Sequence, residues 1–261
     1  MLSLLTILTS CSVNSVVKKP ILDVELTSII ETGVDFEDLA YSSSNKTLYL
    51  CENKTSKIWI YNKNEYLNTI GGNGFGEYKF ERLSDIAISK NGNLLALDNL
   101  KKAIKIYDSN GEYLSTISLN KLNNPMKFSV DRNDFLYVYD NNDHEIVVLN
   151  LMNNSEFIRF GQFEIDLPTN MYIHDDIINF TTYNNQSDYY SVMGDFIVSD
   201  NIASVMDRYQ NRISTQDRFL TINSKIVPGI ILPKRIKQIY ISDDCVIIGT
   251  NKQIQLYKIK Y

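Results

Sequence analysis

The feature that most constrains this chain is a repeat with a period typical of propeller blades. Three times, an acidic residue ends one apolar run and an isoleucine starts the next run six positions later: Glu52 and Ile58, Asp98 and Ile104, Asp140 and Ile146. Successive acidic residues are 46 and 42 positions apart. A period of about 40 to 50 residues that contains four short strands indicates propeller blades rather than a helical solenoid.

The clearest copy spans residues 71–117. Its four apolar runs are residues 85–88, 94–97, 104–107 and 113–117, and the Asn91-Gly92 and Asn110-Gly111 pairs supply turns between them. Short alternating runs joined by Asn-Gly turns predict a four-stranded up-and-down sheet. Because such a sheet cannot bury both of its faces alone, we expect further copies to pack on either side of it.

The order of motifs in this copy carries a resemblance to a known group. Gly74-Phe75-Gly76-Glu77-Tyr78 leads into Asp85-Ile86-Ala87-Ile88, and Gly92-Asn93-Leu94, Asp98, Ile104 and Tyr107-Asp108-Ser109-Asn110-Gly111 follow. Residues 71–140 resemble the NHL-repeat group of six-bladed propellers, and the chain looks most like the six-bladed propeller lipoproteins of bacterial envelopes. The resemblance implies an all-β, six-bladed β-propeller. The group's functions range from protein binding to lyase and lactonase activity, so the fold constrains function weakly.

The ring needs a closure, and the first ordered segment of the chain is the candidate. Residues 236–242, 245–250 and 253–260 read as only three strands of a last blade. We expect residues 21–30, an alternating run before the first recognisable blade, to add its outermost strand. The predicted propeller domain spans residues 21–261, and residues 12–20 form a tether. The fifth blade is the least defined, because residues 196–198, 202–206 and 219–222 surround a charged segment, 207–218, that is helical or a loop.

The N-terminus predicts a lipoprotein-type signal segment over residues 1–11. Its apolar run, residues 1–10, is shorter than the about 20 residues that span a bilayer. Leu8-Thr9-Ser10-Cys11 resembles a bacterial lipobox, which implies acylation of Cys11 and a location in the bacterial cell envelope. The match departs from the pattern in one respect, since no Lys or Arg precedes the apolar run. The alternative is an exposed N-terminal strand.

Charge and cysteine content narrow the function classes. The net charge of -5 gives no reason to expect nucleic-acid binding. The chain is expected to be a monomer. The two cysteines beyond the signal segment, Cys51 and Cys245, are offset by four residues between equivalent strands, which is about 13 Å. That separation exceeds disulfide geometry, so two buried free thiols are expected.

Acidic residues at the ends of second strands form the first candidate site. Glu52, Asp98 and Asp140 should gather on one face, where their oxygens could hold calcium or sugar hydroxyls. The alternative, which their repetition favours, is that each acid caps its own turn. Of the two histidines, His174 follows a first strand near the channel mouth and is the better metal candidate, although zinc sites need three or four ligands. Glu37 and Asp38 could supply the acid of a lactonase-like site, but Asp38 also matches Asp85 as a repeated structural residue.

Two further stretches have separate interpretations. The glycine-rich residues 71–76 precede a strand rather than a helix, which favours backbone freedom at a blade crossing over phosphate binding. Arg208, Tyr209, Arg212 and Arg218 form a cationic, aromatic segment that is a candidate partner contact.

The sequence identifies no catalytic or cofactor-binding residue. It therefore favours an envelope-anchored binding module for a protein, peptide or carbohydrate. The alternative is a metal-dependent hydrolase or lyase, lactonase-like, that acts at the central channel.

Overall fold

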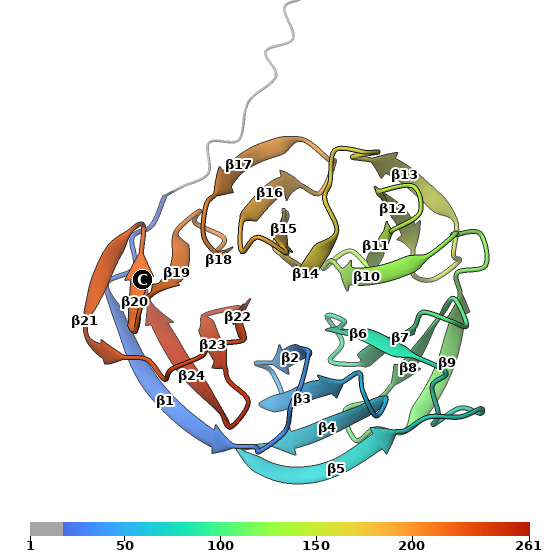
Figure 1. Cartoon of the computed structure of the whole chain (residues 1–261), viewed down its shortest axis with the longest axis horizontal. Coiled ribbons are helices and arrows are strands. Elements are labelled where there is room, and N and C mark those ends of the chain that lie inside the picture. The colour runs from blue at the N-terminus through green and yellow to red at the C-terminus, as the bar shows by residue number, and fades with distance from the viewer. Residues whose placement is uncertain (1–17) are drawn as a thin grey trace, which may run out of the picture.

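The computed structural model describes residues 18–261 as a ring of six four-stranded antiparallel sheets (Figure 1). Blades one to three are β2 (Asp38–Ser42) to β5 (Glu65–Gly71), β6 (Leu83–Ile88) to β9 (Tyr113–Ser118), and β10 (Pro125–Val130) to β13 (Glu156–Phe160). Their middle strands are β3 (Thr47–Glu52), β4 (Lys57–Asn62), β7 (Leu94–Asp98), β8 (Ala103–Tyr107), β11 (Phe135–Asp140) and β12 (Glu145–Asn150). The prediction of an all-β, six-bladed propeller is confirmed.

Blades four to six complete the ring. Blade four contains β14 (Pro168–His174), β15 (Ile177–Thr182), β16 (Ser187–Ser191) and β17 (Phe196–Asp200). Blade five contains β18 (Ser204–Met206), β19 (Arg212–Gln216), β20 (Phe219–Ile222) and β21 (Lys225–Ile231). Blade six contains β22 (Gln238–Ser242), β23 (Cys245–Gly249) and β24 (Gln253–Lys260), with β1 (Asp23–Glu31) outside them. Among the described residues no helix is long and apolar enough to cross a membrane.

The closure by the N-terminal strand is confirmed. β1 pairs antiparallel with β24, from Asp23 opposite Lys260 to Glu31 opposite Gln253 (Figure 1). The chain reaches β1 through Lys19, whose ammonium lies 5.8 Å and 5.7 Å from the ring centroids of Tyr209 and Tyr261. The Asn211 amide donates a hydrogen bond to the Lys19 carbonyl. Both ends of the chain therefore hold one blade together, which removes two free sheet edges.

The fifth blade corrects the sequence prediction. Residues 196–198 belong to β17, the outer strand of blade four, and the charged segment 207–218 contains β19 rather than a helix. The Asp207 carboxylate accepts the backbone N–H groups of Tyr209 and Asn211, which fixes a tight turn before β19. Asp207, one of the charged residues of this segment, therefore stabilises a turn. The fourth strand of the blade, β21, was not predicted.

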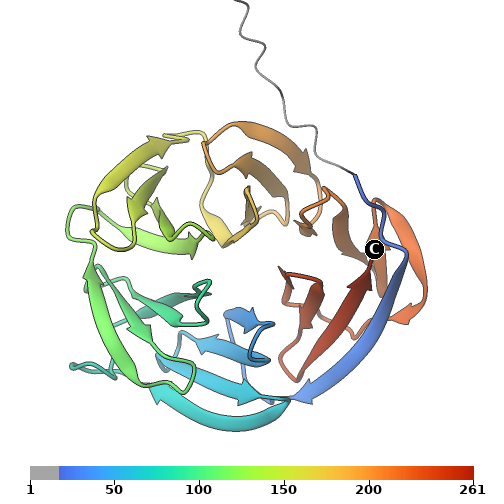
Figure 2. The same cartoon turned by 180° about the vertical axis from the view of Figure 1, so that it is seen from behind.

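The ring has two faces with different connections. One face carries the turns between first and second strands and between third and fourth strands, and we call it the mouth face. The crossing face carries the turns between second and third strands and the loops from one blade to the next. The innermost strands, β2, β6, β10, β14, β18 and β22, lie nearest the axis (Figures 1 and 2). Because outer strands run from the mouth face to the crossing face, β1 begins on the mouth face.

Packing between blades supplies the core. Five clusters of buried apolar side chains fill five of the six seams between neighbouring blades in the described ring. Inner strands are buried almost throughout, as in β7, whereas outer strands such as β9 are mostly exposed. Each sheet carries apolar side chains on both faces, and it buries these faces against the two neighbouring sheets.

Candidate functional site

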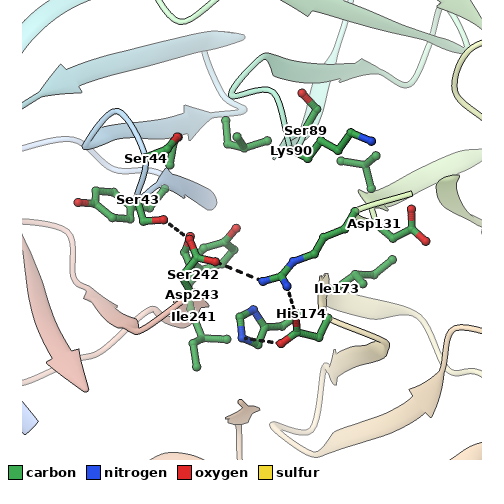
Figure 3. A pocket seen from close by; sticks show the side chains of 17 residues that line it. Ser43, Ser44, Ser89, Lys90, Asp131, Ile173, His174, Ile241, Ser242 and Asp243 are labelled. Atoms are coloured by element: carbon green, nitrogen blue, oxygen red, sulfur yellow. Dashed lines mark hydrogen bonds and ion pairs between the residues drawn. The ribbon is translucent and has the colours of Figure 1, made fainter. Parts of the chain in front are cut away.

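A cavity of about 340 Å³ opens at the axis on the mouth face (Figure 3). The turns that follow the first strands of blades one, two, three, four and six line it, and blade five contributes no lining residue. The lining is rich in hydroxyl groups, from Tyr41, Ser42, Ser43, Ser44, Ser89, Tyr240 and Ser242. Its charged residues are Lys90, Asp131, Arg132, Asp175 and Asp243, and His174 adds an imidazole.

Arg132 spans this cavity from the turn after β10. Its Nη1 lies 2.5 Å from Oδ1 of Asp175 in blade four, and its Nη2 lies 3.3 Å from Oδ1 of Asp243 in blade six (Figure 3). The Ser43 hydroxyl of blade one donates to the other oxygen of Asp243. One guanidinium therefore links four blades around the mouth, and its planar array of donors suits two carboxylates at once.

His174 ends β14 at the cavity wall, and its side chain is 6% exposed. Its Nε2 lies 3.5 Å from Oδ2 of Asp175, and neither atom has a hydrogen-bond partner among the described residues. Burial lowers the pKa of His174, Asp175 opposes this shift, and Arg132 reinforces it. The imidazole is accordingly neutral at neutral pH, when it offers one N–H donor and one nitrogen acceptor.

The other cation at the mouth is also paired. Lys90 Nζ lies 2.9 Å from Oδ2 of Asp134, and the Ser89 hydroxyl accepts the backbone N–H of Asn93. Carboxylates therefore already neutralise both cations that line the cavity, so an anionic ligand would gain little attraction from them. Hydroxyl groups, by contrast, can add a donor or acceptor bond without losing the bonds they already make.

Below the mouth the channel narrows to a cavity of about 30 Å³. Both cavities share the side chains of Ile88, Val130, Ile173 and Tyr240, which form an apolar neck. The small cavity is bordered by Asp38 and Gln238, and Oε1 of Gln238 has no hydrogen-bond partner within residues 18–261. The small cavity is large enough for a water molecule but not for an organic ligand.

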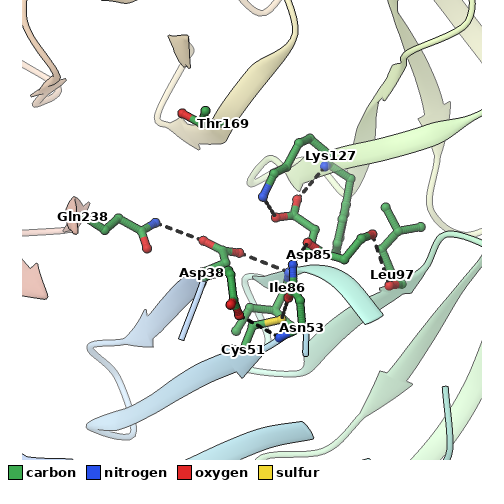
Figure 4. Close-up of polar contacts among 12 residues, drawn as sticks. Asp38, Cys51, Asn53, Asp85, Ile86, Leu97, Lys127, Thr169 and Gln238 are labelled. Carbon is green, nitrogen blue, oxygen red and sulfur yellow. Dashed lines mark hydrogen bonds and ion pairs between the residues drawn. The ribbon is translucent and has the colours of Figure 1, made fainter. Parts of the chain in front are cut away.

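A buried ionic network surrounds this lower part of the channel (Figure 4). Asp85 accepts a hydrogen bond from the Phe128 N–H, and its other oxygen lies 2.7 Å from Lys127 Nζ. Asp38 accepts the Ile86 N–H and the Gln238 amide. Each carboxylate therefore binds the inner strand of the following blade, which matches the interpretation of Asp38 and Asp85 as repeated structural residues.

Burial governs the protonation of this network. Burial raises the pKa of Asp85 well above its usual range, Lys127 opposes the shift, and Asp38 adds to it. Burial alone would lower the pKa of Lys127, but Asp85 and Asp38 outweigh it and hold that pKa above its ordinary value. Asp85 therefore takes up a proton more readily than an exposed aspartate does, while Lys127 keeps its charge.

The predicted metal candidates do not converge. Asp98 accepts the backbone N–H groups of Glu81 and Arg82. Asp140 accepts those of Asn123 and Asn124. Glu52 accepts bonds from Thr55 and Trp59 side chains. All three acids lie on the crossing face, where Asp98 and Asp140 bind the loops that enter their blades, whereas His174 lies on the mouth face. No group of three or more His, Cys, Asp or Glu in the part of the chain that the structure describes could hold a metal ion.

The predicted partner-contact residues do not form one surface. Arg208 and Tyr209 lie in the turn between β18 and β19 on the mouth face, whereas Arg218 lies between β19 and β20 on the crossing face. Arg212 pairs with Asp200. A role for any of them in partner binding stays a prediction.

The cysteine predictions have mixed outcomes. Cys51 and Cys245 are free thiols, as expected, but only Cys51 is fully buried. Cys11 lies outside the described residues.

Sequence reasoning missed the residues that build the mouth. Arg132 and Asp243 lie in turns that were recognisable as turns, but nothing in a single sequence shows that turns from different blades meet at the axis. Their place in the blade was the signal that could have found them, because each follows the first strand of its blade. These residues are Ser43, Lys90, Arg132, Asp175 and Asp243. Listing the turn after each first strand would have gathered the set.

Comparison with known proteins agrees with this architecture. A family model described as a 6-bladed beta-propeller matches residues 39–218, from the first strand of blade one to the second turn of blade five. No curated protein matches the chain.

Proposed function

Since the chain belongs to the family of 6-bladed beta-propellers, we propose that it is a binding module of the bacterial cell envelope, held there by a lipid on Cys11. Its blades would be of the NHL-repeat type found in envelope propeller lipoproteins. Its ligand is a small, neutral, hydroxyl-rich molecule of the carbohydrate class. The ligand occupies the mouth cavity.

The observation that carries this proposal is the chemistry of the cavity wall. Seven hydroxyl-bearing side chains line the cavity, while Arg132 and Lys90 are already paired with aspartates. A ligand with many hydroxyl groups matches donors and acceptors that are spread around a rim. An anionic ligand gains less, because aspartates already neutralise both cations, and two of them, Asp175 and Asp243, also line the cavity.

The size of the cavity is consistent with a small ligand. Its volume of about 340 Å³ lies at the low end of the about 300–1,000 Å³ that is usual for small-molecule sites. The apolar neck formed by Ile88, Val130 and Ile173 closes the cavity below. A sugar ring could therefore lie across the neck with its hydroxyl groups directed at the serine-rich rim.

The anchor and the cavity would lie on the same side of the ring. Cys11 is seven residues before Lys18, so this connection spans at most about 25 Å when fully extended. The first strand among the described residues, β1, begins on the mouth face. The proposed tether would therefore keep the mouth within reach of the membrane surface.

The ligand proposal is tested by binding of neutral mono- and disaccharides, measured by saturation-transfer NMR and calorimetry. Ser242→Trp fills the mouth, and we expect it to weaken binding at least about tenfold. The matched control is Ser115→Trp on β9, an exposed outer-strand position where binding should be unchanged. Equal binding by both variants, or saccharide binding by neither variant nor parent, contradicts the proposal.

The anchor is tested by partitioning between detergent and aqueous phases. Cys11→Ser should move the protein from the detergent phase to the aqueous phase, because about 0.8 kcal/mol per buried methylene is lost with the acyl chains. Cys245→Ser, at a half-buried thiol, is the control and should leave partitioning unchanged. A Cys11→Ser protein that stays in the detergent phase removes the lipid anchor from the proposal.

The hydrolase or lyase alternative has no specific support in the described residues. Glu52, Asp98 and Asp140 each accept hydrogen bonds from nearby groups on one face, and His174 lies on the other. We therefore keep binding as the proposed function.

A further inference from the structure

The loop between β5 and β6, residues 72–82, differs from the other blade crossings in length and shape. It has eleven residues, whereas the other five crossings have three to seven. It projects beyond the ring in both views (Figures 1 and 2). It contains most of the glycine-rich motif of the sequence, and the mouth cavity makes no use of it.

The base of this loop is closely packed. Gly71 has a φ of 97°, and a Cβ at this position would lie 2.4 Å from the Ser56 carbonyl oxygen, so the site requires glycine. Gly74 N–H donates to the Phe80 carbonyl and Phe80 N–H donates to the Gly72 carbonyl, at 3.0 Å and 3.1 Å. The Phe80 side chain is fully buried. These contacts explain why the glycines occur at a blade crossing, as the sequence predicted.

A buried lysine fixes the outer half of the loop. Lys105 on β8 is 4% exposed, and its ammonium donates to the carbonyl oxygens of Gly76, Glu77 and Lys79. Burial lowers the pKa of Lys105, and Lys101 adds to this effect. The Tyr107 hydroxyl also donates to the Glu77 carbonyl, at 2.7 Å. A buried cation with three carbonyl partners holds the backbone of the loop in one conformation.

This rigid loop presents an aromatic side chain to solvent. Phe75 is 79% exposed, and the Lys101 ammonium lies 5.1 Å from the centroid of its ring. Leu100, next to Lys101 on the neighbouring turn, is also exposed. We call Phe75, Leu100 and Lys101 the knob. Exposing an aromatic ring on an ordered loop reduces the entropy that is lost when the ring enters a pocket.

The surroundings of the knob are basic although the chain is acidic. The crossing-face segments 53–56, 72–82, 99–102 and 119–124 contain six basic residues and two acidic ones, whereas the chain has a net charge of -5. The basic residues are Lys54, Lys79, Arg82, Lys101, Lys102 and Lys121. A complementary surface would therefore combine an apolar pocket with an acidic border.

We propose that the knob is a docking site for a partner protein whose surface has an apolar pocket with acidic residues around it. Phe75 fills the pocket, and Lys101 and its basic neighbours face the acidic border. A membrane fits less well, because the knob lies on the crossing face while β1 begins on the mouth face. If Cys11 is the anchor, as proposed above, the crossing face points away from that membrane and the knob lies at the outer edge of that face (Figures 1 and 2). The docking site itself does not depend on the mouth or on its ligand.

The first experiment identifies the partner by position-specific photo-crosslinking. A photo-reactive phenylalanine analogue replaces Phe75 in the full chain in cells that produce it. The control carries the analogue at Phe163, which is 74% exposed on the crossing face between blades three and four. We expect one protein adduct from position 75 that is absent from position 163 and is suppressed by Lys101→Glu. Absence of an adduct specific to position 75 overturns the proposal.

The second experiment measures the affinity of the purified pair by calorimetry. Phe75→Ala should weaken binding at least about tenfold, and Phe163→Ala should leave it unchanged. Lys105→Met should also weaken binding with Phe75 intact, together with faster amide exchange in residues 74–80, because it frees the loop. Equal losses for Phe75→Ala and Phe163→Ala would contradict a specific knob. So would binding of the Cys11→Ser protein to phosphatidylglycerol vesicles that depends on Phe75, since it would make the knob a membrane contact.

Discussion

The seam between blades two and three and the seam between blades four and five use equivalent strand positions with different side chains. In the first, Ala87, Leu95 and Ile106 of blade two lie in one cross-strand row and pack with the row of Phe128, Val138 and Val147. In the second, the corresponding row of blade four is Tyr172, Asn179 and Tyr189. The row of blade five is Ser204, Ser214 and Thr221.

The polar seam is buried as deeply as the apolar one. The Tyr189 hydroxyl and Ser204 Oγ are 2.6 Å apart, as are Ser214 Oγ and Thr221 Oγ1. Asn179, which occupies the position of Leu95, has neither side-chain amide atom bonded within residues 18–261. Of the buried residues in the five apolar clusters, only Tyr172 connects blade four with blade five.

This difference affects stability. A buried apolar side chain contributes about 1.5–3 kcal/mol, whereas a buried hydrogen bond contributes about 1 kcal/mol and an unpaired buried amide costs about 1–3 kcal/mol. The seam between blades four and five should therefore be the weakest in the ring. Closure by β1 and β24 compensates, because the ring can open at this seam only by straining its neighbours. The following predictions test this comparison, from the largest expected effect to the smallest.

The largest effect should follow from placing the polar residue in the apolar seam. Leu95→Asn removes a fully buried leucine and introduces an unpaired amide, so we expect a loss of more than about 3 kcal/mol in the free energy of unfolding. Urea unfolding followed by circular dichroism measures it. Leu95→Ala leaves a cavity without introducing an amide, so it measures the cost of the cavity alone. Its loss of stability should be smaller than that of Leu95→Asn. If Leu95→Asn costs under 1 kcal/mol, the apolar packing of this seam is not the source of its stability.

Breaking the hydrogen bonds of the polar seam should have an intermediate effect. Ser204→Ala leaves the buried Tyr189 hydroxyl and one oxygen of Asp200 without their serine partner, so we expect a loss of about 1–2 kcal/mol. In the parent protein, backbone amides should exchange their hydrogens faster in β18 and β19 than in β7 and β8. This difference should be larger in the variant. Uniform exchange across the ring would remove the distinction between the two seams.

Both seams bear on what a single sequence can predict. Blades one to three were predictable because alternating apolar runs and the six-residue spacing from acid to isoleucine recur there. The closing strand was predictable because its alternating run precedes the first blade while the last blade has only three strands. Asp98 and Asp140 accept the backbone N–H groups of Lys101 and Asn142 in their own turns, as the capping interpretation predicted. Glu52 differs, because it accepts bonds only from side chains.

In blade five the predicted segments 202–206 and 219–222 contain β18 and β20, but β19 and β21 were missed. The charged and polar residues around Ser214 hide the period-two pattern of β19, and Pro228-Gly229 interrupts that of β21.

The candidate site was harder to predict for a different reason. His174 was placed at the channel mouth correctly, but Arg132 gains its role only from the approach of blades four and six. The distances between such turns depend on ring closure. Local sequence patterns carry no information about them.

A gain in stability is expected from the reverse substitution. Asn179→Leu removes two unpaired amide atoms and places a side chain of similar size against Tyr172 and Tyr189. We expect stability to rise by about 1 kcal/mol, which raises Tm by about 2–4 °C in a protein of this size. Differential scanning calorimetry measures it, and Asn179→Ala, which leaves a cavity, should gain less. A marked loss in Asn179→Leu would mean that the asparagine makes an essential bond in solution.

The smallest effect is the pH dependence of the free energy of unfolding that His174 of blade four contributes. Burial lowers the pKa of His174 below its ordinary value of 6.5, so the unfolded chain takes up the proton before the folded one does. The contribution of His174 to stability is therefore complete above pH 6.5 and decreases as pH falls from 6.5 toward the lowered pKa. We expect the parent to lose about 1 kcal/mol or less between pH 7 and 5.5, because one pH unit can contribute at most about 1.4 kcal/mol.

His174→Gln should remove this part of the pH dependence. Comparing urea unfolding at several pH values cancels any constant cost of the substitution, and the interval from pH 7 to 8 is an internal control in which both proteins should have the same slope. The substitution leaves the charged groups that act on His174 in place, namely Asp175, Asp243, Arg132 and Arg208. If the variant keeps the full slope of the parent between pH 7 and 5.5, the imidazole is solvated in solution. Blade four would then bury its polar groups at the seam with blade five but not at the mouth.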